Sequence, residues 1–252
     1  HAVYDEVPEV IGSLGLDHVD AIFFGLGVSS MQLDVRERGF AYSEDAPLDM
    51  RMDQSAGESA AMLVSRTAEH ELADVIYGYG EERFSRRIAR AIVDARRSTP
   101  IETTGQLAAI VRRAVPTRGY QRIDPATRTF QALRIAVNDE LGELERGLDA
   151  AERVLKPEGR LAVVAFHSLE DRIVKHFLTE RSGRISQASR HAPAREEAEP
   201  PTFRQTAKNP IAPGDAEIRV NPRSRSARLR VATRTQTPAR TSSPSVKSGE
   251  HA

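Results

Sequence analysis

The sequence predicts an α/β fold in which a mostly parallel sheet carries an all-helical insertion. Two short apolar runs, at 21–24 and 160–166, are dense enough for strands that are covered on both faces. Between them, residues 55–113 have helical periodicity and no strand pattern. We therefore expect strands on either side of a helical segment, which is how one chain forms a sheet domain with an inserted second domain.

The segments around the first run set the order of the elements. Val7, Val10, Ile11 and Leu14 have helical spacing, and Gly15 follows as a C-cap, so a short helix precedes the first strand. Residues 32–47 are polar and read as an ordered loop. Further helices are expected at 60–63, 71–77, 81–95 and 104–115.

One long helix is expected next, from an Asp124 cap to Leu155, because its apolar residues keep spacings of three and four throughout. After the second strand, Ser168 is expected to cap a helix, with Asp171 completing a capping-box-like pattern. Residues 226–233 alternate enough for a final strand.

The composition of the sequence indicates a protein with a hydrophobic core and excludes several kinds of site. The 252 residues are 39% hydrophobic, which is enough for a core, and the absence of cysteine excludes disulfides and thiolate ligands. The longest apolar run, 161–166, is too short to cross a membrane, and we expect a cytoplasmic protein. Histidines lack HxxxH or HExxH spacing, so no metal site is expected.

Basic residues are clustered although the net charge is zero. Twelve arginines lie between Arg83 and Arg134, and residues 218–248 contain arginines but no acidic residue. Such clusters neutralise phosphates in nucleic-acid-binding proteins, and they also occur as solvated helix faces. Composition alone leaves both interpretations open.

Seven motifs carry a resemblance to a known family. They are GLGVSSMQLD from Gly25, RGFAY, PLDMRMD, YGEERFSRRIARAIV from Tyr79, PATRTFQALRIAVNDEL from Pro125, AFHSLEDRIVKHF from Ala165 and NPRSRSARLRVA from Asn221. In this order they resemble the 16S ribosomal RNA (cytosine-N4) methyltransferases, the MraW or RsmH-like family. The resemblance implies a Rossmann-like class I methyltransferase sheet with an all-helical inserted domain, S-adenosylmethionine as cofactor, and 16S rRNA in the small ribosomal subunit as partner.

The resemblance also implies a domain layout. It places a partial methyltransferase domain at 1–33 and 122–234, and a helical insertion for substrate recognition at 34–121. Residues 182–201 are expected to be mobile, and 235–252 to form a disordered tail. The family's glycine-rich cofactor loop and the acidic residue for the ribose have no counterpart in this sequence, so the chain resembles an amino-terminally truncated member.

Three positions match cofactor residues of the family. Tyr4 falls where the family has an aromatic residue beside the adenosine, and Gln32 matches a glutamine that contacts the cofactor. Gly25 stands where the family has an aspartate, and glycine has no side chain to accept a hydrogen bond. Asp124 stands where the family has histidine, and its capping role explains it locally.

The catalytic candidates have local alternatives. The hydroxyls of Ser29 and Ser30 would orient the base or the methyl donor, or else serve the turn. His167, between a strand and a helix, would meet the substrate or fix that turn. Phe40 and Tyr42 would stack on an extruded base or close the loop onto the insertion.

The helix around 83–97 is the expected RNA-binding element, through Arg83, Arg86, Arg87 and Arg90. The function that the resemblance implies is methyl transfer to N4 of a cytosine in 16S rRNA. The alternative is a non-catalytic or degenerate RNA-binding relative, which Gly25 and the missing cofactor loop favour. A DNA-binding regulator ranks last, since no helix-turn-helix signature is present.

Overall fold

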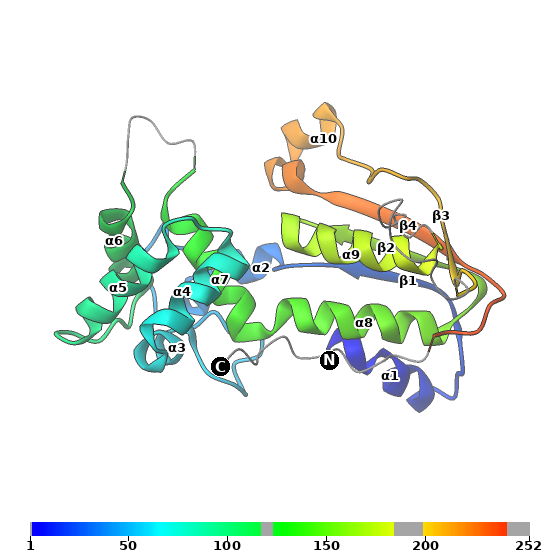
Figure 1. The fold of residues 1–252 in the computed structure, drawn as a ribbon, viewed down its shortest axis with the longest axis horizontal. Coiled ribbons are helices and arrows are strands. Elements are labelled where there is room, and N and C mark those ends of the chain that lie inside the picture. Colours follow the sequence, from blue (N-terminus) through cyan, green and yellow to red (C-terminus); the bar gives the residue numbers. More distant parts are fainter. Residues whose placement is uncertain (1, 117–122, 184–198, 241–252) are drawn as a thin grey trace, which may run out of the picture. The chain divides into compact units, whose positions relative to one another are not determined.

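The computed structural model describes residues 2–116, 123–183 and 199–240, and the chain forms two compact units (Figure 1). The first unit comprises His1–Gly27 and Leu141–Ala252, and the second comprises Val28–Glu140. Most of the segment expected to be mobile and most of the expected tail lie outside the described residues. Each unit has its own hydrophobic core.

The first unit is built on a four-stranded sheet of order β1-β2-β4-β3. Its strands are β1 (Val19–Gly25), β2 (Leu155–Ala165), β3 (Phe203–Gln205) and β4 (Arg228–Arg234). β1 and β2 are parallel, while β4 is antiparallel to both β2 and β3. The three strands that the sequence predicted are confirmed, and β3, only three residues long, was missed. The sheet of the described residues is mixed rather than mostly parallel, and β1 is not covered on both faces, since Phe23 is 67% exposed.

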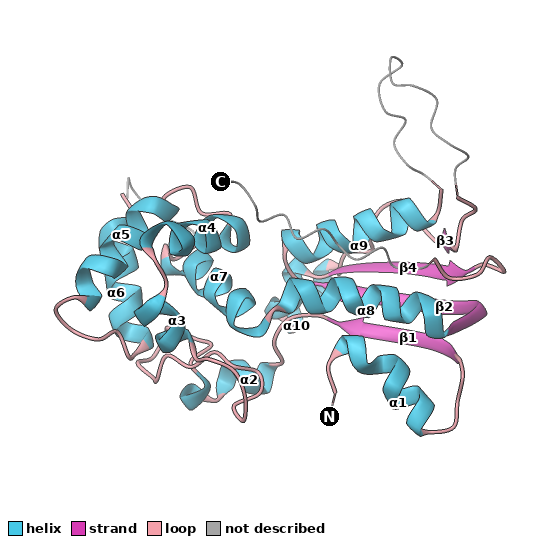
Figure 2. Cartoon of the chain, turned by 60° about the horizontal axis from the view of Figure 1, so that its bottom comes forward, coloured by secondary structure: helices cyan, strands magenta, loops and turns pink. Residues whose placement is uncertain are grey.

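Helices cover this sheet. α8 (Glu140–Val154) and α9 (Ser168–Arg181) run side by side along it, and α1 (Val7–Ser13) precedes β1 (Figure 2). Leu144 and Leu148 of α8 and Val174 and Phe177 of α9 share one core with Phe24 of β1. Burial of these side chains holds the helices against the sheet. The short elements η1 (Tyr4–Glu6), α10 (Asp215–Val220) and η3 (Pro222–Ser226) were not predicted.

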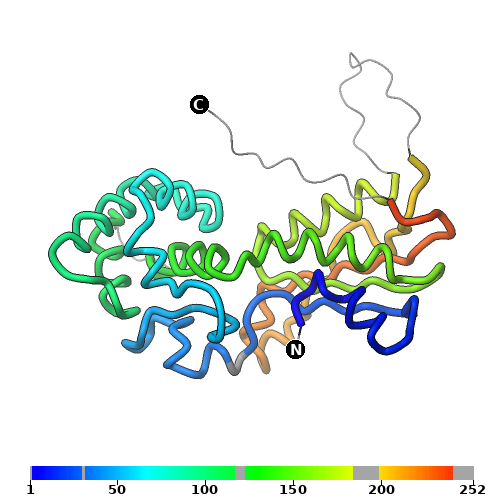
Figure 3. Tube along the Cα trace, turned by 90° about the horizontal axis from the view of Figure 1, so that it is seen from below, coloured from blue at the N-terminus to red at the C-terminus, as the bar shows by residue number. Residues whose placement is uncertain are grey.

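The second unit is helical, and Figure 3 follows the chain through it from the blue loop after β1 to green α7. Its elements are α2 (Ser30–Asp34), η2 (Arg36–Arg38), α3 (Ala60–Arg66), α4 (Glu69–Gly80), α5 (Ser85–Arg96), α6 (Thr104–Ala114) and α7 (Ala126–Asn138). The four helices predicted between 55 and 115 are confirmed as α3 to α6. In the described part of this unit no strand is formed, as expected.

The prediction of a single helix from Asp124 to Leu155 is wrong. α7 ends at Asn138 and α8 begins at Glu140, because Asp139 between them has φ 47°. The Asn138 side chain also ties this break to a loop: its Oδ1 accepts from Met52 N at 2.7 Å and its Nδ2 donates to Met50 O at 2.8 Å. The apolar spacing continues across the break because the apolar residues of α7 pack in the core of the helical unit and those of α8 pack in the core of the sheet unit.

None of the helices in the described ranges is long and apolar enough to span a membrane.

Candidate active site

Tyr4 and Gly25 lie together at the carboxyl end of β1. The Tyr4 hydroxyl donates to the Gly25 carbonyl at 2.7 Å, and the Tyr4 ring packs on Phe24 with 4.9 Å between ring centroids. The 3-10 turn η1 places Tyr4 there, directly before α1. Two of the three residues matched to the cofactor therefore meet at a strand end, where α/β sheets bind ligands.

The backbone conformation at position 25 does not require a glycine. A Cβ built at this position meets only Phe23 Cε1, at 3.5 Å, which is an ordinary contact, and the residue lacks a positive φ. Gly27, two residues later, differs, because its φ is 78° and a Cβ there would lie 3.7 Å from Glu170 Oε1. A side chain can thus be added at Gly25 without strain, whereas Gly27 serves the turn.

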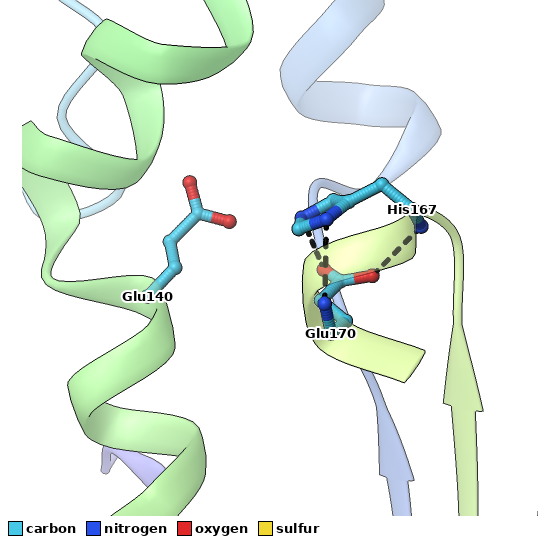
Figure 4. A group of neighbouring side chains, drawn as sticks. All are labelled: Glu140, His167 and Glu170. Atoms are coloured by element: carbon cyan, nitrogen blue, oxygen red, sulfur yellow. Dashed lines mark hydrogen bonds and ion pairs between the residues drawn. The ribbon is translucent and has the colours of Figure 1, made fainter. Parts of the chain in front are cut away.

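His167 caps α9, the helix that follows β2 (Figure 4). Its Nδ1 accepts from Glu170 N at 3.4 Å, and Glu170 Oε2 accepts from the backbone N of Phe166 at 2.7 Å and of His167 at 3.1 Å. The cap predicted at Ser168 and Asp171 therefore lies one residue earlier, because His167 is still extended while Ser168 is helical. Asp171 instead forms an ion pair with Arg230 of β4 at 2.7 Å.

This geometry supports the local interpretation of His167. His167 Nδ1 is occupied as the acceptor for Glu170 N, and its Nε2 lies 3.1 Å from Glu170 Oε1. Both ring nitrogens of His167 therefore face groups of the cap. The residue that sequence reasoning missed is Glu170, and the signal was the spacing of three between His167 and Glu170, typical of a capping box.

Glu170 is a buried carboxylate, with 2% of its surface exposed. Burial raises its pKa, but hydrogen bonds from the His167 ring and from the backbone N–H groups of Phe166 and His167 together outweigh burial and lower the pKa. Glu170 is therefore ionised at neutral pH, and it fixes the turn at the carboxyl end of β2.

Ser29 and Gln32 form a reciprocal pair at the start of α2 in the second unit. Gln32 Oε1 accepts from Ser29 N at 2.8 Å, and Ser29 Oγ accepts from Gln32 N at 3.2 Å. Both side chains therefore serve the turn, and a contact of Gln32 with the cofactor stays a prediction. The side chain of Ser30 lies outside the described part of the structure.

Phe40 and Tyr42 belong to the core of the helical unit. Phe40 is buried there, and Tyr42 packs on Phe130 at 4.8 Å and hydrogen-bonds to Thr127 Oγ1 at 2.6 Å. Closure of the loop is thus the role that the structure supports for both rings. A base-stacking role would require them to leave this core.

Asp124 has the capping role expected from the sequence. Its Oδ1 accepts from Ala126 N at 2.8 Å, and Arg112 pairs with its carboxylate through Nη2 at 2.8 Å. Burial raises the pKa of Asp124, and the hydrogen bonds from Arg112 and Ala126 outweigh it, so the pKa is lowered. The acid is therefore a structural anion at the start of α7.

The four arginines predicted to bind RNA lie in or directly before α5. Arg83 stacks over the Phe84 ring at 4.6 Å, Arg90 lies 3.5 Å from Glu69, and Arg86 and Arg87 are exposed. The arginines of the last strand differ: Arg230 pairs with Asp171, and Arg234 donates to the carbonyls of Glu152 and Thr202. Basic residues of α5 are therefore available to a polyanion, while these two arginines of β4 hold the first unit together.

A four-stranded mixed sheet covered by helices, with a helical unit inserted between β1 and β2, is consistent with a class I methyltransferase fold. The model of the MraW methylase family matches residues 1–235. The chain belongs to the MraW methylase family, which confirms the predicted resemblance and fold class.

Several relatives share one name, ribosomal RNA small subunit methyltransferase H. One from Methylobacterium sp. (strain 4-46) is 57% identical over 94% of this chain and 70% of its own length. One from Paramagnetospirillum magneticum is 56% identical over 94% of this chain and 74% of its own. One from Rhodospirillum rubrum is 53% identical over 96% of this chain and 74% of its own.

Family membership confirms two further predictions, that of a methyltransferase and that of S-adenosylmethionine as its cofactor. A contact of Tyr4 and Gly25 with the adenosine part of this cofactor stays a prediction. Tyr4 offers a half-buried aromatic ring, and Gly25 leaves the strand end open. Bound cofactor would supply an electrophilic methyl group on a sulfonium.

Proposed function

We propose that this chain methylates N4 of a cytosine in 16S ribosomal RNA, in the context of the small subunit. The observation that carries the proposal is the match to the MraW methylase model over residues 1–235, supported by relatives named as small-subunit rRNA methyltransferases at 57% identity. The substrate class is ribosomal RNA. The cytosine, its N4 position and the small-subunit context are the finer parts of the proposal.

The chain's own residues have three tasks in this reaction. Tyr4 and Gly25 would orient the adenosine at the end of β1, Gln32 would contact the same cofactor, and the His167–Glu170 cap would fix the neighbouring turn after β2. Bound cofactor would supply its methyl group to the N4 amine, with the carbon–sulfur bond replaced by the N4–methyl bond, and the amine would give up one proton. Positioning would supply much of the rate, since the donor is already electrophilic.

The helical unit is the proposed substrate-recognition part, and its arginines Arg83, Arg86, Arg87 and Arg90 are the proposed RNA contacts. Support comes from their place in or directly before one helix, α5, which has no acidic residue in its first turn. No metal takes part in the proposed reaction, because the sulfonium needs no Lewis acid. A cytoplasmic site of action follows from the proposed ribosomal substrate.

Nothing in the described residues or among these relatives favours the alternative of a non-catalytic RNA-binding protein. Family membership and high identity to methyltransferases weigh against it.

Transfer of tritium from labelled S-adenosylmethionine to small ribosomal particles tests the proposal. The assay uses this chain extended with the family's amino-terminal cofactor-loop segment, because the sequence has no counterpart of that loop. Label in the 16S rRNA of particles isolated from cells without this methyltransferase supports the proposal. Equal background label with and without the enzyme would refute it, and particles that already carry the methyl group serve as the control.

A further inference from the structure

A groove lies between α5 and α6 of the helical unit, two helices that run side by side (Figure 2). Its volume is about 450 Å³, which is within the range of sites for small organic ligands. The groove has a charged rim and an apolar floor. The rim consists of Arg87, Arg90, Asp94 and Arg113, and the floor of Ala91, Ala95, Ile110 and Ala114.

The rim is positive on both sides. Arg87 and Arg90 come from α5, and Arg113 comes from the last turn of α6. All three are exposed, and Arg90 has only a long contact with Glu69, at 3.5 Å. Exposed pairs of this kind contribute little stability, so Arg90 can exchange this partner for another anion.

The one acid of the rim does not cancel this charge. Asp94 is paired with Arg97 at 3.0 Å, so its carboxylate already has a cation beside it. Three arginines therefore face the groove against one carboxylate that has a partner outside the lining. The groove is suited to an anion.

The position of Arg87 does not serve helix stability. Arg87 is in the first turn of α5, where the helix dipole disfavours cations, and that turn contains no acidic residue. Arg113, in contrast, is in the last turn of α6, where the dipole favours a cation. The dipole argument therefore supports a ligand role for Arg87, and the case for Arg90 and Arg113 rests on their place at the groove.

We propose that this groove binds a nucleotide unit of single-stranded RNA, with phosphates on Arg87, Arg90 and Arg113 and a base against the apolar floor. The floor distinguishes this ligand from free phosphate, because alanine and isoleucine side chains gain nothing from an inorganic anion but do gain from covering a base. It also disfavours a duplex, whose bases are stacked and paired inside. The inference rests on the proposed ribosomal RNA substrate. It adds Arg113 to the proposed RNA contacts and locates one nucleotide in the groove.

Two adjacent arginines of α6 offer a matched test. Arg113 lines the groove, while Arg112 is outside the lining and pairs with Asp124 at 2.8 Å. Arg113→Gln and Arg112→Gln therefore remove the same charge from neighbouring positions. Fluorescence anisotropy with a labelled single-stranded RNA dodecamer, measured over a range of salt concentrations, gives affinity and salt slope for both variants of the full chain. Thermal melts check that each variant is folded.

The expected result is a three- to tenfold loss of affinity for Arg113→Gln and a salt slope smaller by about one, as for loss of one phosphate contact. Arg90→Gln should behave likewise, and Arg112→Gln should stay within twofold of the unmodified chain. A duplex of the same sequence should bind more weakly, and millimolar inorganic phosphate should compete poorly.

Equal losses for Arg112→Gln and Arg113→Gln would show a general positive field and overturn the groove, while RNA binding itself would stand. Unchanged affinity in Arg113→Gln and Arg90→Gln would overturn it as well. If inorganic phosphate competed as strongly as RNA, the ligand of the groove would be a simple anion and the proposal of a nucleotide would be wrong. Failure of the unmodified chain to bind any RNA would overturn both the groove and RNA recognition by this unit, while the tritium assay separately decides the methyl transfer.

Discussion

Single residues decide how much of the cofactor site this chain can form. Gly25 is the clearest case, because the resemblance places an aspartate there and a Cβ at this position would meet only Phe23 Cε1, at 3.5 Å. A carboxylate at this position would accept hydrogen bonds at the end of β1, beside the Tyr4 hydroxyl. Glycine has no side chain to accept these hydrogen bonds.

Gly25→Asp, made in the extended chain, should therefore raise methyl transfer. A charge-assisted hydrogen bond is worth roughly 1.5–3 kcal/mol, which is about a tenfold to hundredfold rate change if it acts on the transition state. Tritium transfer to small-subunit particles measures the effect. Gly27→Asp is the control, because a positive φ of 78° and the nearby Glu170 oxygen make it unfavourable. Equal rates for Gly25→Asp and the parent would end the claim that Gly25 impairs the site.

The buried carboxylate of Glu170 makes the stability of the fold depend on pH. Its pKa is lowered from the ordinary value of 4.5, because hydrogen bonds to the ionised form outweigh burial. A group with a lowered folded-state pKa stabilises the fold above its unfolded pKa, and this contribution is lost as the pH falls through the folded value. The stabilisation is thus complete at pH 7, begins to decline near pH 4.5 and is lost as the pH falls through the lower folded-state pKa.

Glu170→Gln should cost about 1–3 kcal/mol of unfolding free energy at pH 7, since an amide replaces a buried carboxylate that accepts two backbone N–H groups. Urea unfolding at several pH values measures it. The difference from the parent should shrink as the pH falls below 4.5. A difference that stays constant over this pH range would show that the ionised form is not what stabilises the turn. Glu9→Gln, at an exposed position of α1, should change little.

At the scale of elements, close helix contacts depend on small residues that periodicity does not reveal. Gly80, the last residue of α4, lies against α7: a Cβ there would be 2.6 Å from Arg128 O. Gly78, two residues earlier in the same helix, faces open space, because a Cβ there would meet no atom within 4 Å. The two glycines look alike in sequence and differ in packing.

Gly80→Ala should lower stability by about 1–3 kcal/mol, because the methyl group must displace the backbone of α7. Gly78→Ala should raise stability by about 0.4–1 kcal/mol through the smaller entropy of the unfolded chain. Denaturant unfolding of both variants gives the comparison. Equal effects of the two substitutions would mean that α4 does not approach α7 this closely.

Element boundaries also mark the limit of prediction from sequence. The core strands and helices α3 to α6 were predictable, because their apolar residues alternate or recur at helical spacing. Asp139 was not, since one left-handed residue between two helices leaves the apolar spacing intact. The cap at His167 was misplaced by one residue because Ser and Asp are the commoner capping residues, and only the fold shows Glu170 reaching back to Phe166 N.

At the scale of the whole molecule, family and reaction class followed from motifs, whereas side-chain roles needed the three-dimensional structure. Phe40 and Tyr42 could be read as base-stacking residues until burial placed them in the helical core. Likewise, no pattern distinguishes Arg230, paired with Asp171, from Arg87, which is exposed beside the groove. The partner of an arginine is set by distant parts of the chain.

The isolated chain should bind S-adenosylmethionine weakly or not at all. Tyr4 and the end of β1 are the only predicted adenosine contacts in the first unit, and the sequence has no counterpart of the glycine-rich loop or of the acidic residue for the ribose that the resemblance implies. Titration calorimetry checks this directly. Micromolar affinity would contradict it and show that the remaining residues suffice, and the extended chain is the positive control.

The central claim is that this chain, extended with the family's amino-terminal cofactor-loop segment, methylates N4 of a cytosine in 16S rRNA. Mass spectrometry of nucleosides tests it most directly, after the extended chain has acted on undermethylated small particles with deuterium-labelled S-adenosylmethionine. We predict label in N4-methylcytidine, from a single fragment of 16S rRNA. Label confined to 5-methylcytidine or to another nucleoside, or no label while cofactor and RNA are both bound, would contradict the claim.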